Sequence, residues 1–441
     1  MRFLVLLPHR MMVRNWITSG ALDLLTRRGH AVTACLRAHD WQDLPQHPRS
    51  RLRWLPLDGL GGGRLRGRVR AALRLGSLVA REEGSTTYTH KLGQARPMLG
   101  RLEIATWRRF RARVPGGSDG GLMEERLRGL EGRFRPRRAM IETIRDLRPD
   151  VLLWATLIHQ DNEELEVVKA CRAWEIPIVA APASWDNLSS KGGFMVAPDR
   201  MVVWGEESAG HATKWHTCPA GRIHVTGPPH WDLYADVQRL VHPRTVLVAG
   251  TSVNYWEDEL ACLTMLGQDG LTHDYRVLYR PHPRGAFGWK SSDIMPAGVA
   301  RDPITSQQVC MGRPGWTLHP DDLFAYASLL ASVDAVVAAF STLTIEAALL
   351  GKTPLMVGYG RTRHGPGMSS VHAAYEHMAH VVQAPGVMTA QTAEDLVRHV
   401  RNAVNGQYRQ YATVLREMAL RVARVDGHAR ERVVAVLESM K

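Results

Sequence analysis

Residues 336–351 combine the residue types that can hold an anionic group. An apolar run, Val-Val-Ala-Ala-Phe, ends at Ser341 and Thr342, and a helix-forming run that contains Glu346 follows. Hydroxyl groups at such a strand-to-helix junction lie beside the unpaired backbone N–H groups of the helix start, where phosphate commonly binds. We expect Ser341 and Thr342 to contact phosphate and Glu346 to accept hydrogen bonds from ribose hydroxyl groups.

Two other apolar runs in the same half of the chain also end in polar residues. In open parallel sheets, ligands bind beyond the carboxyl ends of the strands. Arginine presents a planar fork to phosphate, histidine can donate from its ring, and glycine permits close backbone approach. For any one loop, the alternative is that a hydroxyl only caps a helix and that Arg280 only pairs with a carboxylate. Three loops together predict a nucleotide site, and the further candidates are Arg280, His282 and Arg284 in one loop and Gly250, Thr251 and Ser252 in the other.

These loops resemble those of GT-B glycosyltransferases that use cytidine-activated donors. Residues 279–284 (Tyr-Arg-Pro-His-Pro-Arg) are similar to their His-Pro motif, and Ser341-Thr342 is similar to their Ser-Ser or Ser-Thr motif. The group includes bacterial sialyltransferases, β-Kdo transferases of capsule synthesis and CDP-glycerol glycerophosphotransferases of teichoic acid synthesis. Residues 203–205, 225–228 and Asp232 also resemble the domain junction of surface-polysaccharide transferases. The resemblance implies donor phosphates at both motifs and a GT-B fold, in which two Rossmann-like domains face a cleft.

The first half of the chain is expected to bind the acceptor and to supply the catalytic base. Asp186 follows an apolar run at residues 177–181, and a carboxylate there could take a proton from an acceptor hydroxyl group. Asp186 is the preferred base and His282 the second catalytic candidate, with His9 as a further choice; turn formation by Asp-Asn is the alternative for Asp186. The residues expected to bind the acceptor are His9, Arg10, Arg14, Asn15 and Lys191.

Metal and cofactor motifs are missing from the sequence. The first strand-to-helix loop lacks Gly-x-Gly-x-x-Gly, which argues against a nicotinamide or flavin enzyme. No Asp-x-Asp pair follows a strand; Glu257-Asp258-Glu259 and Asp321-Asp322 are interpreted as solvated helix starts. We expect no cofactor and no metal. Position 338, eight residues before Glu346, is alanine, so the Glu-x7-Glu pair of many retaining GT-B enzymes is absent and an inverting mechanism is favoured.

The order of apolar runs predicts an α/β protein with two domains. A strand at residues 3–7, a helix at 16–28 and a strand at 31–36 open a doubly wound parallel sheet. We expect an N-terminal acceptor domain at 1–237 and a C-terminal nucleotide-donor domain at 238–441, which ends in helices. With 441 residues, the chain is too long for one ordinary core.

A basic insertion is expected at about residues 51–148. This stretch contains 23 Lys plus Arg and 10 Asp plus Glu, and the difference, 23 − 10 = 13, equals the net charge of the whole chain. Three interpretations remain open: a solvated arginine-rich face, contact with an anionic membrane or a lipid-linked acceptor, and nucleic-acid binding. The last is the least favoured because no nucleic-acid module accompanies the charge.

Composition indicates a cytoplasmic protein, peripheral on the inner face of the membrane if the insertion binds lipid. The five cysteines are far apart, without a Cys-x-x-Cys pair, and no apolar run of eighteen residues occurs. The apolar start, residues 3–7, stops at Pro8 and is interpreted as a buried strand and not as a signal peptide.

The sequence as a whole predicts a transferase. It would move a sugar or glycerol-phosphate from a nucleotide-activated donor to a cell-surface glycan acceptor, and the resemblance favours cytidine as the nucleotide. One alternative is a nucleotide-sugar 2-epimerase of the same fold, although the acidic and Arg-Pro-Glu signature of that family is replaced here by the glycine-rich, basic residues 358–364. The other is a non-catalytic GT-B-like partner protein that acts through the basic region.

Overall fold

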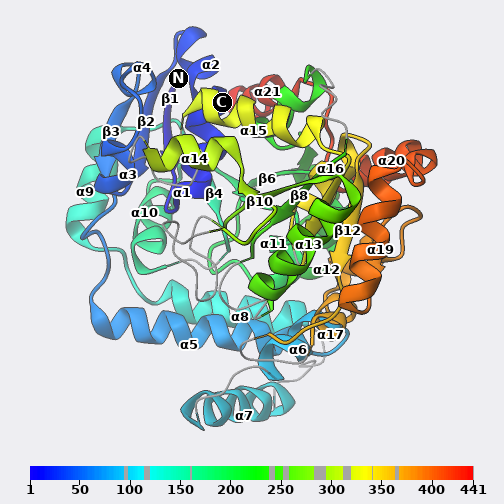
Figure 1. Cartoon of the computed structure of the whole chain (residues 1–441). Coiled ribbons are helices and arrows are strands. Elements are labelled where there is room, and N and C mark those ends of the chain that lie inside the picture. The colour runs from blue at the N-terminus through cyan, green and yellow to red at the C-terminus, as the bar shows by residue number, and fades with distance from the viewer. Residues whose placement is uncertain are drawn as a thin grey trace. The chain divides into compact units, whose positions relative to one another are not determined.

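The computed structural model describes residues 1–93, 98–113, 120–158, 161–237, 244–251, 258–282, 295–310, 319–339, 341–362 and 367–440. The chain divides into two compact units (Figure 1). The first unit contains residues 1–232 and 423–441, and the second unit contains residues 233–422. The last segment therefore belongs with the first unit, whereas the sequence placed it in the second domain.

The first unit is built on a seven-stranded parallel sheet with the order β3-β2-β1-β4-β5-β6-β7. Its central strands β1 and β4 are buried along nearly their whole length and are almost entirely apolar, as expected for strands with both faces covered by helices. Trp154, Leu4 and Leu6 are fully buried in its core. The strands are β1 (Arg2–Leu6), β2 (Ala31–Leu36), β3 (Arg53–Pro56), β4 (Val151–Thr156), β5 (Ile178–Pro182), β6 (Arg200–Val203) and β7 (Ile223–Val225).

The helices of the first unit follow the expected α/β alternation. Residues 16–28 do not form one helix: Gly20, with φ near +80°, separates a π-helical turn from α2. The elements are α1 (Arg10–Val13), η1 (Arg14–Thr18), α2 (Ala21–Arg27), α3 (Ala38–Gln42), α4 (Gln46–Ser50), α5 (Arg64–Ala80), α6 (Thr86–Gly93), α7 (Met98–Arg113), α8 (Gly120–Gly132), α9 (Arg138–Leu147), α10 (Asn162–Ala173), α11 (Asn187–Ser190), α12 (Glu206–His216), η2 (Ala220–Arg222) and α21 (Ala429–Glu438); η3 (Pro229–Ala235) spans the boundary between the units.

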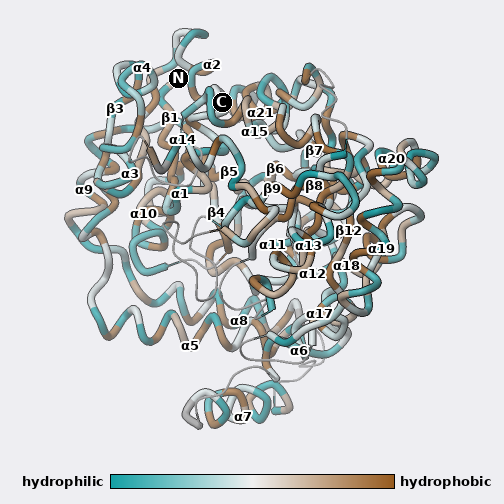
Figure 2. The backbone as a smooth tube through the Cα atoms, in the orientation of Figure 1, coloured by the Kyte–Doolittle hydropathy of each residue, from teal (hydrophilic) through white to brown (hydrophobic). Residues whose placement is uncertain are grey.

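The arginine-rich region, residues 51–148, contributes the strand β3 and then the helices α5 to α9. Helix α5 runs alongside α8, with α7 beyond it, and both α5 and α7 mix hydrophilic and hydrophobic residues along their length (Figures 1 and 2). Several of its charges are buried. The Arg70 guanidinium lies 3.0 Å from both Glu131 and Glu166. Arg81 pairs with Glu124, and both of these side chains are buried as well. A solvated face is therefore wrong for these residues, which hold the helices together.

The C-terminal segment completes the first unit. Asp232 accepts hydrogen bonds from the backbone N–H groups of Ala429 (2.8 Å) and Arg430 (2.9 Å), and so it caps α21. The backbone of Arg424 donates to the carbonyl oxygen of Trp204 at 2.7 Å. A Cβ at Gly227 would overlap the Arg424 carbonyl, so only glycine permits this crossing.

The second unit has a six-stranded parallel sheet with the order β10-β9-β8-β11-β12-β13. Val246, Val248 and Leu355 lie in its core. The strands are β8 (Thr245–Ala249), β9 (Arg276–Arg280), β10 (Val299–Arg301), β11 (Ala335–Ala338), β12 (Thr353–Val357) and β13 (Met388–Ala390). The helices are α13 (Glu259–His273), α14 (Pro303–Cys310), α15 (Pro320–Ser332), α16 (Leu343–Leu349), α17 (Met368–Ala374), α18 (Glu376–Val382), α19 (Ala393–Val404), η4 (Arg409–Tyr411) and α20 (Ala412–Val422). The predicted α/β class with two parallel sheets is confirmed.

Candidate functional site

The topology of the second sheet marks its ligand-binding edge. From β8 the chain builds β9 and β10 on one side and then crosses to build β11, β12 and β13 on the other. Ligands of doubly wound sheets bind at such a crossover point, outside the carboxyl ends of the strands. The crossover lies between β8 and β11, so the loops that begin at Gly250 and Ala339 flank it. These are two of the three loops singled out in the sequence.

The loops after β8 and β9 are in close contact. The backbone N–H of Gly250 donates to the carbonyl oxygen of Arg280 at 2.8 Å. A Cβ on Gly250 would lie 2.8 Å from the Tyr279 hydroxyl group and 3.0 Å from the backbone nitrogen of His282. A side chain at position 250 would therefore collide with the loop after β9. The absence of a side chain lets the backbone of Gly250 lie next to that of His282.

A buried carboxylate that was not predicted holds Thr251 in place. Glu259, at the start of α13, accepts hydrogen bonds from the Thr251 backbone N–H at 2.9 Å and from the Tyr279 hydroxyl group. Burial raises the pKa of Glu259, and these hydrogen bonds partly offset that rise. The interpretation of Glu259 as a solvated helix start is therefore wrong.

The same interpretation is wrong for Asp322 in α15. Its side chain is buried, and its carboxylate accepts a hydrogen bond from the Gln308 side-chain amide.

Arg280 is occupied by protein partners. Its guanidinium donates to the buried Asp302 carboxylate at 3.2 Å and lies over the Tyr326 ring, 4.3 Å from its centroid. Asp302 also accepts from the backbone N–H of Ile304. Pairing with a carboxylate, the alternative for Arg280, is therefore what the described residues show, and its contact with phosphate remains a prediction.

The loop after β11 presents two hydroxyl groups at the crossover. The Ser341 hydroxyl oxygen accepts from the Leu343 backbone N–H at 3.2 Å, which is the capping role given as its alternative. Thr342 is half-buried, and among the described residues its side chain makes no capping hydrogen bond to α16. His372, which sequence reasoning missed, lies 3.0 Å from the Ala339 carbonyl oxygen through Nε2. Burial lowers the pKa of His372, which favours the neutral ring and a donated hydrogen bond.

Glu346 is turned toward a tyrosine. Its buried carboxylate accepts a hydrogen bond from the Tyr234 hydroxyl group, which comes from η3. One oxygen is therefore taken by the protein. Its predicted contact with ribose stays a prediction. The other two residues of the predicted nucleotide site, Ser252 and Arg284, lie outside the described residues.

In the first unit, the crossover point lies between β1 and β4. His9 follows β1, and its Nδ1 accepts from the Met11 backbone N–H at 3.1 Å, so the ring caps α1. Arg10 pairs with the buried Asp40 at 2.6 Å and also with Asp43. Both residues have local structural partners, and acceptor binding by either is still a prediction.

Arg14 and Asn15 join the first loop to the loop after β5. The Arg14 guanidinium donates to the Asn15 side-chain oxygen at 3.0 Å and lies 3.5 Å from Nε2 of His230. The Asn15 amide donates to the Ala183 carbonyl oxygen at 3.0 Å. Burial and the neighbouring Arg14 charge hold the pKa of His230 well below its usual value, so its ring is neutral and can accept from Arg14.

Asp186 begins the short helix α11 and is half-buried. Its carboxylate accepts from the Ser190 hydroxyl group at 3.1 Å and from the Asn187 amide at 3.3 Å. These hydrogen bonds agree with the alternative role for Asp186, which was turn formation. The Asp186 side chain nevertheless keeps some contact with solvent. Lys191 follows on the same loop, also half-buried, so the predicted base and one predicted acceptor residue are neighbours.

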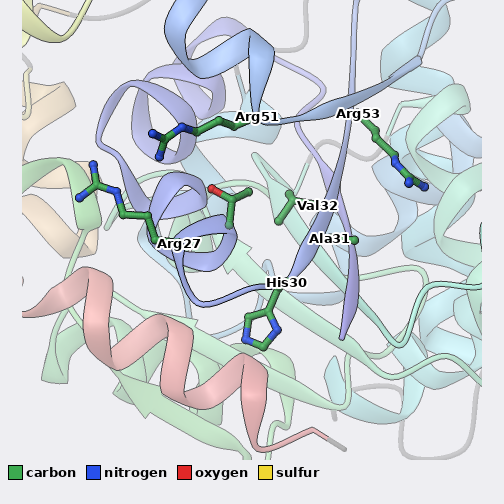
Figure 3. A pocket seen from close by; sticks show the side chains of 7 residues that line it. Arg27, His30, Ala31, Val32, Arg51 and Arg53 are labelled. Atoms are coloured by element: carbon green, nitrogen blue, oxygen red, sulfur yellow. The ribbon is translucent and has the colours of Figure 1, made fainter.

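Two pockets lie away from these edges. One, of about 370 Å³, is lined by Arg27, Arg51 and Arg53 and lies at the amino ends of β2 and β3, opposite the ligand-binding edge (Figure 3). Arg27 and Arg51 both pair with Asp23. The other, of about 300 Å³, lies between α14 and α15. Neither contains a residue predicted for the site.

Metal and membrane features were also sought within the described ranges. There, no three or more His, Cys, Asp or Glu side chains are arranged to hold a metal ion. Among the helices of the same ranges, none is long and apolar enough to span a membrane.

Comparison with known proteins identifies the fold. Neither a protein-family model nor a curated protein sequence matches the chain. Among solved structures, a protein described as a UDP-N-acetylglucosamine 2-epimerase from Listeria monocytogenes has a TM-score of 0.53 at 14% identity, covering 99% of this chain and 96% of that one. The kitacinnamycin glycotransferase has a TM-score of 0.53 at 12% identity, covering 100% and 98%. The Methanocaldococcus jannaschii UDP-GlcNAc 2-epimerase, solved with UDP-GlcNAc and UDP, has a TM-score of 0.51 at 11% identity, covering 100% of both chains.

These similarities show that the chain has the GT-B fold. The fold alone does not select a reaction, because one architecture serves many functions.

Proposed function

We propose that the chain is a nucleotide-dependent transferase that moves a sugar or glycerol-phosphate to a cell-surface glycan. The observation that carries this proposal is the position of the candidate loops. Gly250-Thr251 and Ser341-Thr342 flank the crossover point of the second sheet, and His282 adjoins Gly250. The same-fold proteins support it: one is a glycotransferase and another was solved with UDP-GlcNAc and UDP.

In the proposed reaction, an acceptor hydroxyl oxygen bonds to the transferred group as the bond from that group to the donor phosphate breaks. The nucleotide leaves with the bonding electron pair. Thr342 and His282 would stabilise the phosphate, and Asp186 would take the hydroxyl proton in an inverting, metal-independent step. The resemblance of the His-Pro and Ser-Thr loops favours a cytidine donor.

Nucleotide binding to the full chain tests the donor site. Thermal unfolding is measured with CMP, CDP, UDP, GDP and dTDP and their activated donors. CMP or CDP is expected to raise the unfolding temperature, and Thr342→Val and His282→Ala should each reduce that rise. Thr272→Val, an exposed threonine on α13, is the control and should leave the rise unchanged. If no nucleotide stabilises the protein, the proposal fails.

A nucleotide-sugar 2-epimerase is the second candidate. It is favoured by the fold of two proteins described as UDP-GlcNAc 2-epimerases, which the chain matches over nearly its whole length. Incubation with UDP-GlcNAc alone, followed by NMR, distinguishes the two. Appearance of the C2 epimer without any acceptor would support the epimerase and refute the transferase. An unchanged sugar, together with cytidine nucleotide binding, would support the transferase.

The arginine-rich helices α5 and α7 would place this transferase at the cytoplasmic face of a membrane. Leu65 is 76% exposed on α5 and Leu102 is 56% exposed on α7, among exposed arginines that include Arg68 and Arg109. Exposed apolar side chains interleaved with basic ones suit an anionic lipid surface. Co-sedimentation with phosphatidylglycerol vesicles, but not with phosphatidylcholine vesicles, is the expected result. It should weaken with added salt.

A further inference from the structure

Two tryptophans form a stacked pair at the outer edge of the first sheet. Trp54 lies on β3, the terminal strand of that sheet, and Trp41 lies on α3, which follows β2 and lies beside β3 (Figure 1). The two ring planes differ by 5°, and the ring centroids are 5.6 Å apart. Parallel rings touch at about 3.5 Å, so these two are displaced sideways, and neither ring is fully covered by the other.

The Trp54 ring is fixed by the end of the neighbouring strand. Its indole N–H donates to the carbonyl oxygen of Leu36, the last residue of β2, at 3.2 Å. The side chain is nevertheless 37% exposed, and among the described tryptophans only Trp174 is also classed as exposed. Exposed apolar surface often marks a binding site, and a ring that is already held in place loses little freedom when a ligand binds.

The pair lies toward the ligand-binding edge of the first sheet. Leu36 ends β2 and Trp41 follows it on α3, so the rings are near the carboxyl ends of the strands, where doubly wound sheets bind ligands. Helix α3 is also tied to the predicted acceptor loop, because Arg10 pairs with Asp40 at 2.6 Å and with Asp43. Trp41 directly follows Asp40 in the sequence. The stacked pair is therefore continuous with the loop after β1.

The polar groups beside the rings suit an uncharged ligand that is rich in hydroxyl groups. The Arg49 guanidinium lies 5.6 Å from the centroid of the Trp41 ring. Within the described ranges, no protein group accepts from the Trp41 indole N–H, which is not buried. The formal charges of Arg10 and Arg49 balance those of Asp40 and Asp43. The surroundings of the pair therefore have no excess positive charge of the kind that attracts a nucleic-acid backbone.

We propose that Trp41 and Trp54 form a subsite for one pyranose ring of the acceptor glycan, away from the reacting hydroxyl group. A pyranose carries C–H groups on its faces, which pack against an aromatic face, and hydroxyl groups at its rim, which accept from the Trp41 N–H and from Arg49. An oligosaccharide that contacts both the rings and the loop after β1 binds more tightly than a single sugar. This inference rests on the proposed function only in assigning the sugar to the acceptor.

Binding of the full chain to arrayed sugars tests the proposal. The array holds monomers and oligomers of glucose, galactose, mannose, rhamnose and N-acetylglucosamine, with poly(dT) as a nucleic-acid probe. At least one oligomer should retain the chain more strongly than its monomer does. Trp54→Ala should weaken that binding about tenfold, because a stacking partner is lost. Retention of no sugar, or of poly(dT) alone, would overturn the proposal.

Trp174→Ala is the matched control. Trp174 is 47% exposed in the same unit, and its indole N–H also donates to a backbone carbonyl oxygen, that of Ile141, at 3.0 Å. It lies between α10 and the start of β5, toward the amino ends of the strands. Trp174→Ala should therefore bind sugar as the unmodified chain does. An equal effect of Trp174→Ala and Trp54→Ala would count against the subsite.

Chemical modification of the unmodified chain tests the same contact without a substitution. N-bromosuccinimide oxidises exposed tryptophans, and peptide mass spectrometry locates the oxidised residues. The oligosaccharide that the array identifies should protect Trp54 and leave Trp174 reactive. Equal oxidation of Trp54 with and without that sugar would refute the proposal, whether or not Trp54→Ala folds.

These measurements contain no nucleotide, so their failure is distinct from failure of the proposed function. Trp54→Ala should keep its stabilisation by CMP or CDP in thermal unfolding. Sugar binding that depends on Trp54, in a chain that binds no nucleotide, would support the subsite and refute the transferase. Nucleotide binding without any sugar binding would do the reverse.

Discussion

Replacing Arg70 by methionine tests whether the arginine-rich region is part of the core of the first unit. The Arg70 side chain is 3% exposed, and its guanidinium lies 3.0 Å from Glu131 and from Glu166, both fully buried. Lys169 also pairs with Glu131 at 2.9 Å, and Arg66 pairs with Glu166 at 3.3 Å. Without Arg70, each carboxylate would keep one cation, but the two would face each other without the charge between them.

Breaking a buried ion pair by removing one partner costs about 3 to 5 kcal/mol, because the other charge stays buried. We expect Arg70→Met to lower the free energy of unfolding of the first unit by about this amount. Arg68, two residues earlier on the same helix, is exposed. Arg68→Met should change the stability by less than about 0.5 kcal/mol, and it should weaken sedimentation with anionic vesicles.

Urea unfolding followed by tryptophan fluorescence measures this difference in the right unit. Of the chain's 13 tryptophans, only Trp256, Trp289 and Trp316 fall within residues 233–422, and the other ten belong to the first unit. Circular dichroism reports both units together and shows whether they unfold in separate steps. Adding Glu166→Gln to Arg70→Met should recover part of the loss, because one buried charge disappears. Equal stabilities of Arg70→Met and Arg68→Met would refute the reasoning.

Three further predictions concern single residues. Gly250→Ala should reduce stabilisation by CMP or CDP in thermal unfolding, because its Cβ would press on Tyr279 and on the His282 backbone; an unchanged response would contradict this. Asp232→Ala should destabilise the first unit by about 2 to 4 kcal/mol in urea, because one buried and one part-buried N–H group of α21 lose their acceptor. Equal stability of the variant would show that the cap is not needed. Burial raises the pKa of Glu164 to about 8, so the folded chain keeps a proton that the unfolded chain loses near its ordinary pKa. Stability should therefore fall as the pH rises from about 4.5 to 8, and Glu164→Gln should remove that part of the fall; an identical pH profile for the variant would exclude Glu164 as its source.

The sequence predicted the strands that are buried on both faces, because each of them is a nearly continuous apolar run. It missed β3, β10 and β13, which lie at the edges of the sheets. β3 has only Leu55 half-buried among exposed residues, and β10 and β13 have three residues each, so none has a clear apolar pattern.

The loops of the candidate site were predictable, but the partners of their residues were not. Arg280 directly follows its strand in the sequence, whereas Asp302 and Tyr326, which occupy its guanidinium, come from elements whose approach depends on tertiary packing. Glu259 resembled an ordinary acidic helix start because nothing local indicates that Tyr279 and Thr251 will surround it.

The return of α21 to the first unit has a consequence for how the protein is made. A ribosome synthesises residues 233–422 after most of the first unit but before the helix that completes it. The second unit can therefore fold before the Asp232 carboxylate has formed its hydrogen bonds with the backbone N–H groups of Ala429 and Arg430. During that interval the surface of α2 that packs against α21 in the finished unit is not yet covered by it.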